Sequence, residues 1–326
     1  SVVAAAHTAF ARFHTSIVGQ PRRMFMAAAV SSVRVVISDF DGTLCPFGHS
    51  KPISAANVAA LTAAHERNIH VSLATGRIPG LWLDRVREQL PFVGPSVFAN
   101  GALLVAPDGG VLASSTLPPS AVDAVREYTA GGAIGGRKVA VLAATRWPEA
   151  GPEYGSVRYV ELAPDGPTWV TALIKSAGEP DVVRVADLAV LDTAGVFKFV
   201  LFTRADDADW APMADAVRHL RAALGETATV VDCGPGQCEV LPAGVQKGAG
   251  VARLLAGGYL GGDVVPAAAA LAIGDAENDV EMLRLAGVGA AVGGAKPAAL
   301  AAADVVVASC AEDGVAEAVR KYVLEA

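Results

Sequence analysis

The chain has 326 residues, more than the ~150 residues of an average domain, so we expect one large domain or two smaller ones. Hydrophobic residues make up 52% of it, but 65 residues are alanine, and no stretch reaches the ~20 uninterrupted apolar residues of a membrane-spanning helix, so we expect a soluble protein without a membrane partner. The net charge of −7 makes the chain a poor match for nucleic acid.

Residues 1–32 form an N-terminal extension whose composition differs from the rest of the chain. They hold three arginines and no acid, so the remaining residues carry −10. Phe10, Phe13 and Ile17 would share one helical face, as in an organellar transit peptide. An upstream or artificial extension is the alternative, since methionines stand shortly before the first expected strand. We expect a cytoplasmic location, with mitochondrion or plastid as the alternative.

From residue 33 onward, short β-branched runs alternate with alanine-rich stretches of helical periodicity, which predicts a doubly wound parallel sheet with helices on both faces. The expected strands span residues 33–38, 70–74, 96–99, 271–273, 288–292 and 304–309. The expected helices span residues 54–67, with Ser54 as the cap, 79–89, 277–286, 297–302 and the segment from 312 onward. Ligands of such sheets bind at the carboxyl ends of the strands, where the candidate residues are therefore sought.

The middle of the chain has a different texture, with most of the Trp, Pro and Gly-rich loop material. Its expected elements are strands at 137–142, 196–202, 227–231 and 238–241 and a helix at 208–224. A mixed α+β module inserted between two halves of the sheet domain fits this pattern. We predict a core domain of residues 33–117 and 241–326, and an inserted domain of residues 118–240.

Two carboxylates, Asp39 and Asp41, directly follow the first expected strand. Side chains two residues apart along a strand point to the same face of the sheet. If the strand continued, both carboxylates would therefore lie on that face. We expect the chain to leave the sheet at Gly42, which brings both acids to the open end of the strand. The alternative is a solvated Asp-rich turn without a function.

The sequence Thr75-Gly76-Arg77 stands between the second strand and the next expected helix. A hydroxyl and free backbone N–H groups at that position form an anion cradle, to which a helix N-terminus adds partial positive charge. The alternative is a helix cap at an ordinary turn.

Residues 274–279 read GDAEND and follow the strand at 271–273. So many acids and amides in one turn are costly unless a hard cation neutralises them, and helix capping explains only one of them. Lys247 lies upstream, just before an expected helix, and a single lysine is usually solvated.

In this order, the motifs resemble those of the haloacid dehalogenase superfamily, and more narrowly its Cof-type branch (subfamily IIB). They are DxDGTL at 39–44, TGR at 75–77, Lys247, and GDxxND at 274–279. The resemblance covers roughly 33–115 and 238–322, and it implies a Rossmann-like α/β core with an inserted α+β C2-type cap domain. One departure is Gly293-Gly294-Ala295, where relatives commonly have Gly-Asn-Ala.

The resemblance also implies a role for each motif residue. Asp39 would be the nucleophile that forms an aspartyl phosphate, and Asp41 the general acid and base. The resemblance implies Mg²⁺ as the cofactor, with ligands from Asp39, the backbone carbonyl of Asp41, Asp275 and Asp279, the last through a water molecule. The residues implied to bind phosphate or substrate are Thr75, Lys247, Gly42, Gly76, Arg77, Asn100 and Asn278.

We therefore expect a Mg²⁺-dependent phosphatase, a phosphoric monoester hydrolase of small phosphorylated metabolites, with sugar phosphates as the favoured class. One alternative is a phosphomutase similar to phosphomannomutases. The TGR sequence favours a hydrolase over this alternative. A non-catalytic phospho-receiver or metabolite-binding module is another, which the long insertion disfavours. We expect a monomer or weak homodimer whose partner is a small phosphate ester. Candidate cap contacts to the leaving group are Trp147, Tyr154 and Trp169.

Overall fold

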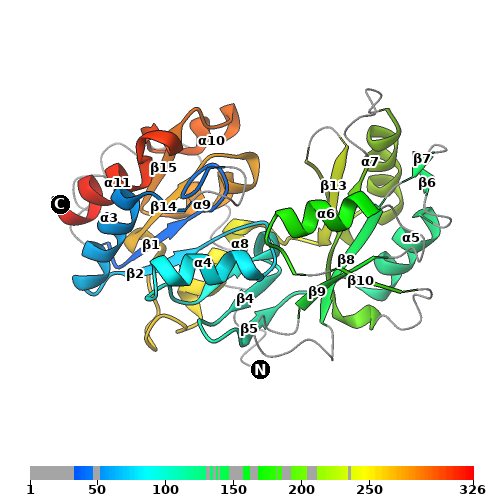
Figure 1. Cartoon of the computed structure of the whole chain (residues 1–326), viewed down its shortest axis with the longest axis horizontal. Helices are drawn as coiled ribbons and strands as arrows, with labels where there is room; N and C mark the ends of the chain where they lie inside the picture. Colours follow the sequence, from blue (N-terminus) through cyan, green and yellow to red (C-terminus); the bar gives the residue numbers. More distant parts are fainter. Residues whose placement is uncertain are drawn as a thin grey trace.

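The structure is a computed structural model that describes residues 33–46, 52–129, 133–134, 137–138, 140–146, 157–161, 168–180, 182–185, 192–203, 211–233 and 236–326. The expected N-terminal extension, Trp147 and Tyr154 lie outside the described residues. Within those ranges, none of the helices is both long enough and apolar enough to traverse a lipid bilayer. Figure 1 shows two lobes, one built from the beginning and end of the chain and one from its middle.

The first lobe contains a five-stranded parallel sheet with the strand order β16-β15-β14-β1-β2. Its strands are β1 (Val35–Ser38), β2 (His70–Leu73), β14 (Ala270–Gly274), β15 (Val288–Gly293) and β16 (Val305–Ser309). In the register of the sheet, Ser38 lies beside Leu73 on one side and Ile273 on the other. The chain therefore leaves β1, β2 and β14 at the same edge, and the three expected motifs meet there.

Helices cover both faces of this sheet, which confirms the predicted doubly wound α/β core (Figure 1). On one face lie α3 (Ala55–Glu66), α4 (Leu81–Gln89) and α11 (Gly314–Val319), which continues as a π-helical turn (Arg320–Leu324). On the other face lie α8 (Lys247–Ala256), α9 (Val280–Leu285) and α10 (Pro297–Ala302). As expected, Ser54 caps α3, because its side chain accepts the amide hydrogen of Asn57.

The third expected strand, β3 (Ser96–Phe98), pairs differently from the prediction. It forms an antiparallel sheet with β4 (Leu103–Val105) and β5 (Val111–Ser114), and a single parallel bridge between Ala74 and Val97 connects it to β2. The tight turn of residues 99–101 reverses the chain immediately after β3, so the next strand returns alongside it.

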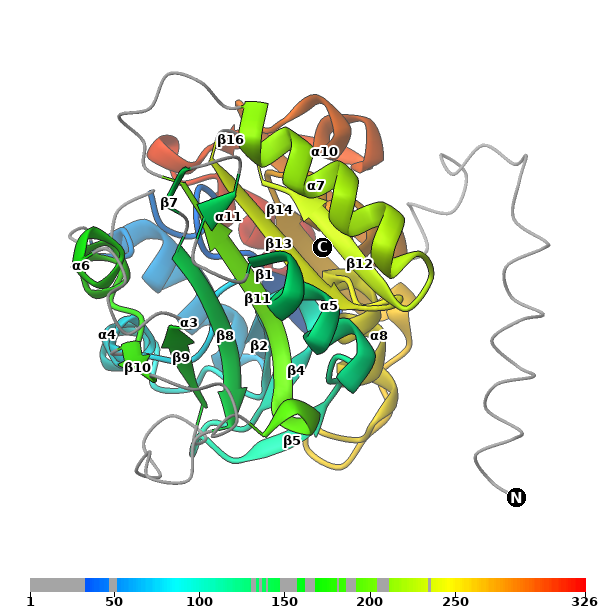
Figure 2. The ribbon, with the colours of Figure 1, turned by 90° about the vertical axis from the view of Figure 1, so that its right-hand side faces the viewer.

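The second lobe is built on a six-stranded mixed sheet with the order β10-β9-β8-β11-β13-β12. Its strands are β8 (Ala140–Arg146), β9 (Val157–Glu161), β10 (Val182–Arg184), β11 (Val196–Phe202), β12 (Ala228–Asp232) and β13 (Gln237–Pro242). Figure 2 shows α5 (Pro119–Thr129) and α7 (Ala211–Leu224) on its outer face, and α6 (Thr168–Ser176) lies at the side. A small hairpin pairs β6 (Ala133–Ile134) with β7 (Arg137–Lys138).

This second lobe, called the cap below, agrees with the mixed module expected from the sequence. The prediction lacked α5, β6, β9, α6 and β10. The boundaries at 117/118 and 240/241 stay a prediction, because β13 runs across the second of them.

The inner face of the cap sheet packs directly on the core. One apolar cluster joins Phe40 and Trp82 of the core with Tyr159 and Phe197 of the cap. Along β11, Phe199 and Leu201 face the outer helices, while Val200 lies in the inner cluster. The two lobes therefore share buried apolar surface in addition to the polar contacts described next.

Candidate active site

A cleft of about 540 Å³ lies between the core and the cap. Its core wall carries nine of the predicted site residues, Asp39, Asp41, Thr75, Gly76, Arg77, Asn100, Lys247, Asp275 and Asn278. Its cap wall includes Tyr159, Leu173, Ile174, Glu179, Lys198, Gln237 and Glu239. Trp169, a predicted cap contact, instead packs against the inner apolar cluster.

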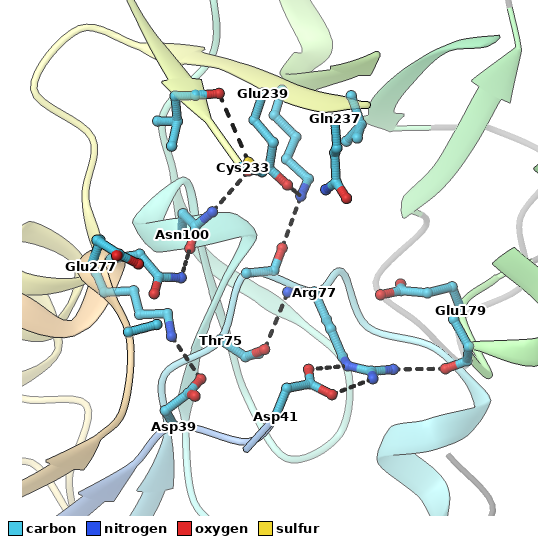
Figure 3. A pocket seen from close by; sticks show the side chains of 18 of the residues that line it. Asp39, Asp41, Thr75, Arg77, Asn100, Glu179, Cys233, Gln237, Glu239 and Glu277 are labelled. Atoms are coloured by element: carbon cyan, nitrogen blue, oxygen red, sulfur yellow. Dashed lines mark hydrogen bonds and ion pairs between the residues drawn. The ribbon is translucent and has the colours of Figure 1, made fainter. Parts of the chain in front are cut away.

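Asp39 lies at the floor of the cleft and forms an ion pair with Lys247 (Figure 3). The Lys247 ammonium donates to Asp39 at 2.6 Å and to Asp279 at 2.7 Å, and all three side chains are buried. Burial raises the pKa of Asp39 well above its usual value, and the Lys247 charge opposes this rise. Burial alone would lower the pKa of Lys247, but the two carboxylates raise it, so the lysine keeps its charge.

The Asp279 carboxylate fixes the backbone conformation of the loop after β14. Its second carboxylate oxygen accepts the amide hydrogens of Asp275 and Ala276, each at 2.9 Å. A side chain on Gly274 would lie 2.6 Å from the Asp279 side chain, so only glycine fits this close approach. Because both oxygens of Asp279 are engaged, its direct contacts in this structure are to Lys247 and the loop backbone.

Asp39, Asp275 and Asp279 could hold a divalent cation. One carboxylate oxygen from each lies within 4.8 Å of the others. With Lys247, the cluster carries a formal charge of −2, and burial followed by the charge of Asp279 raises the pKa of Asp275. Such a set of buried oxygen ligands with surplus negative charge fits Mg²⁺.

Asp41 is held by Arg77 through two hydrogen bonds of 2.6 Å, one to each carboxylate oxygen. The guanidinium lies 5.2 Å from the ring centroid of Phe40 and 5.3 Å from that of Trp82. It also donates to the backbone carbonyl of Ala177 in the cap at 2.7 Å. Arg77 therefore orients Asp41 and connects it to the cap (Figure 3).

The turn after β3 places Asn100 between the core loops and the cap. Ala99 and Asn100 both have positive φ, at 50° and 54°, which is a strained backbone for residues other than glycine. This turn positions the Asn100 amide, which donates to Glu239 at 2.8 Å and accepts from Asn278 at 3.0 Å.

Lys198 provides a second connection from the cap. It is 2% exposed and donates to Glu239 at 2.7 Å and to the backbone carbonyl of Gly76 at 2.9 Å. A shift in strand register between Val196 and Lys198 accompanies its position on the inner face of β11. Burial would lower the pKa of Lys198, but Glu239 raises it, so the lysine keeps its charge.

Two predicted contacts have other partners. The Gly42 amide donates to the Cys45 carbonyl at 2.8 Å inside its own turn, so its expected bond to phosphate stays a prediction. The Thr75 hydroxyl accepts from the Arg77 amide at 3.1 Å inside its own turn, and it also lines the cleft. The helix-cap alternative is wrong, because α4 begins at Leu81 and its cap residue is Gly80.

Four residues of the site were not predicted: Thr43, Glu179, Lys198 and Glu239. Thr43 donates to Asp275 at 3.0 Å and was detectable as part of the first motif. Glu239 precedes Lys247 in a stretch that already resembled the family. Lys198 stands in the expected strand at 196–202, whose pattern gave no sign of a functional residue, and Glu179 stands in a segment without a recognisable pattern.

Comparison with known proteins gives consistent matches. A family model described as haloacid dehalogenase-like hydrolase matches residues 36–143 and 175–319. The HMP-PP phosphatase of Cronobacter sakazakii is 30% identical over 274 residues, which cover 81% of this chain and 85% of that protein. The chloroplastic endoribonuclease YBEY of Arabidopsis thaliana is 28% identical over 298 residues, 88% of this chain but only 46% of that protein, so the chain spans less than half of its length.

Solved structures extend the match to the whole fold. The structure of a haloacid dehalogenase subclass IIB sugar phosphatase aligns with a TM-score of 0.70 at 20% identity, covering 89% of this chain and 99% of that one. At that identity the likeness establishes the fold alone.

Proposed function

The chain belongs to the haloacid dehalogenase-like hydrolases, and we propose that it is a Mg²⁺-dependent phosphatase that works through an aspartyl-phosphate intermediate. The observation that carries the proposal is the buried contact between Lys247, Asp39 and Asp279 at the carboxyl end of β1. The ammonium keeps a desolvated carboxylate available as a nucleophile and can attract the phosphate.

In the first step, an Asp39 oxygen attacks phosphorus while the bond from phosphorus to the leaving oxygen breaks. Asp41 protonates that oxygen, and in the second step it takes a proton from the water that attacks phosphorus. The bond between phosphorus and the Asp39 oxygen then breaks, which releases inorganic phosphate and restores the Asp39 carboxylate. Arg77 holds Asp41 in position for both transfers. Lys247 and Thr75 are proposed to contact the phosphate oxygens, with Gly76 and Asn278 beside them.

Asp39 and Asp275 would hold Mg²⁺, together with the backbone carbonyl of Asp41, while Asp279 would act through a water molecule. When bound there, the ion supplies positive charge that stabilises the phosphate oxygens.

Small phosphorylated metabolites are the proposed substrates, with sugar phosphates as the favoured class. The names of two related proteins, an HMP-PP phosphatase and a subclass IIB sugar phosphatase, support small organic phosphates in general. We further propose that the protein acts as a monomer or weak homodimer, without nucleic acid or membrane, in the cytoplasm. The chloroplastic relative favours the plastid among the alternative locations.

The decisive experiment measures phosphate release from p-nitrophenyl phosphate and a panel of sugar phosphates. Asp39→Asn should lower turnover by at least ~10⁴-fold, as loss of a nucleophile does. Asp263→Asn is the matched control, because Asp263 is 69% exposed and lies outside the cleft lining. Chelation should abolish activity and added Mg²⁺ should restore it. Unchanged turnover of Asp39→Asn would exclude the mechanism, and a requirement for a bisphosphate activator would favour the phosphomutase.

A further inference from the structure

The cap end of the cleft contains a carboxyl group that the proposed chemistry does not use. Glu179 stands in the turn after α6, and this turn is docked on the core. The carbonyl of Ala177 accepts from Arg77, and the carbonyl of Gly178 accepts the amide hydrogen of Trp82 at 3.0 Å. The backbone of Glu179 is therefore held where the cap meets the core.

The side chain of Glu179 is 7% exposed and lines the cleft. Figure 3 shows its carboxyl group pointing into the cleft above Arg77, on the same side as Gln237. Its Oε2 atom has no hydrogen-bond partner among the residues that the structure describes. A buried carboxyl oxygen without a partner is costly, and because the Glu179 oxygen belongs to a residue that lines the cleft, a ligand group in the cleft can complete its hydrogen bonding.

The protonation state of Glu179 suits such a contact. Burial raises the pKa of Glu179 to about 8, although the charges of Arg77 and Lys198 oppose the rise. At neutral pH the group therefore carries a proton on most molecules. A protonated carboxyl both donates and accepts, as a substrate hydroxyl does.

The surroundings of Glu179 make one polar contact important. Leu173 and Ile174 of α6 and Val200 of β11 line the same cleft, and the polar end of Lys198 is already bonded to Glu239 and Gly76. In a largely apolar pocket, a few polar groups fix the orientation of the ligand.

We propose that Glu179 selects the substrate by hydrogen bonding to a hydroxyl group on the alcohol part of the phosphate ester. This inference rests on the proposed function, because it places the phosphate at Asp39 and the alcohol toward the cap. It assigns Glu179 a role in specificity and none in the bond-breaking steps.

The test compares kcat/KM for the best hydroxylated ester of a sugar phosphate panel with that for p-nitrophenyl phosphate, which has no hydroxyl on its leaving group. Glu179→Leu should lower kcat/KM for the hydroxylated ester by roughly 10–100-fold, as expected for a lost buried hydrogen bond, and leave the aryl ester within about 3-fold. Glu179→Gln should retain most of the selectivity, because an amide also donates and accepts.

Glu161 offers a matched control. It is another buried cap glutamate with a pKa raised by burial and an unpartnered oxygen, but it lies outside the cleft lining and pairs with Arg184. Glu161→Gln should leave the selectivity ratio unchanged.

Equal losses on both esters in Glu179→Leu would overturn the inference. An equal loss on a simple alkyl phosphate that has no hydroxyl would also overturn it, because a residue acting only through Arg77 and Asp41 impairs the departure of every alkyl alcohol. An unchanged ratio, or a wild type that hydrolyses only the aryl ester, would also overturn it while the proposed function stands. A wild type that releases phosphate from no ester would reject both.

Discussion

Two buried lysines, one at each end of the cleft, are bonded in nearly the same way but differ in charge balance. Lys247 of the core donates to two carboxylates, whereas Lys198 of the cap donates to one carboxylate and one backbone carbonyl. With Asp275, the core cluster keeps a surplus of negative charge, while Lys198 and Glu239 are balanced. The unbalanced cluster is the one suited to bind a cation and attack phosphorus, and the balanced pair is suited to hold the cap on the core.

After loss of the Asp39 nucleophile, the largest effect should come from removing the acid at the core end. Asp41→Asn should lower the turnover of alkyl phosphates by ~10²–10⁴-fold, because it can no longer protonate the leaving oxygen. Turnover of p-nitrophenyl phosphate should fall much less, since nitrophenolate leaves without a proton. Steady-state rates for a series of esters of rising leaving-group pKa measure the difference. Equal losses along the series would assign Asp41 a purely structural role.

Replacing the core lysine should affect catalysis more than replacing the cap lysine. Lys247→Met should lower turnover by ~10²–10³-fold, the usual loss for a charged donor in an active site. The exposed Lys296 provides a control, because Lys296→Met changes the same side chain outside the cleft lining. A loss in Lys247→Met smaller than that in Lys198→Met would reverse the assignment of the two lysines.

Replacing the cap lysine should act mainly on stability. Lys198→Met leaves Glu239 buried without its cation, which should lower the free energy of unfolding by ~3–5 kcal/mol. The double variant Lys198→Met/Glu239→Gln should recover part of this loss, because neither of the two positions then carries a buried charge. The side-chain oxygen of the new glutamine can still accept the hydrogen bond from Asn100. Urea unfolding of the two single variants and the double variant measures the coupling. Additive losses would show that the two side chains do not stabilise each other.

The smallest effect concerns pH. Because folding raises the pKa of Glu179 from 4.5 to about 8, the folded state binds this proton more tightly, so its contribution to stability is full below about pH 4.5 and is lost as the pH rises to 8. Between pH 6 and 8 the loss should be about 2 kcal/mol.

The groups that face Glu179, namely Arg77, Lys198 and Asp41, are unchanged in Glu179→Gln, so urea unfolding of this variant should show a weaker dependence on pH. Parallel curves for wild type and variant would contradict the raised pKa.

The core end could be predicted from sequence because three of its four motifs directly follow a strand, whereas Lys247 opens α8. Asp39, Thr75 and Asp275 converge because parallel strands of one sheet end at one edge, which is a property of the fold class. The reversal from β3 to β4 could not be foreseen, because it depends on left-handed backbone at Ala99 and Asn100, neither of which is glycine.

The cap end could not be predicted in the same way. Lys198 stands in an apolar run, and the side of the sheet that it faces depends on a register shift that only pairing with β8 creates. The position of Glu179 depends on a turn whose carbonyl groups accept hydrogen bonds from Arg77 and Trp82. These two residues lie about a hundred positions earlier in the chain. Long-range packing therefore decides which cap residues reach the cleft.

The contacts that close the cleft are made by the same loops that are proposed to hold the phosphate. Lys198 bonds to the carbonyl of Gly76, beside Thr75, and Glu239 bonds to Asn100, which in turn bonds to Asn278. A movement that separates Lys198 and Glu239 from the core breaks these bonds, and it thereby also releases the loops that are proposed to hold the phosphate. We therefore expect the opening of the cap and the loosening of the phosphate loops to be coupled.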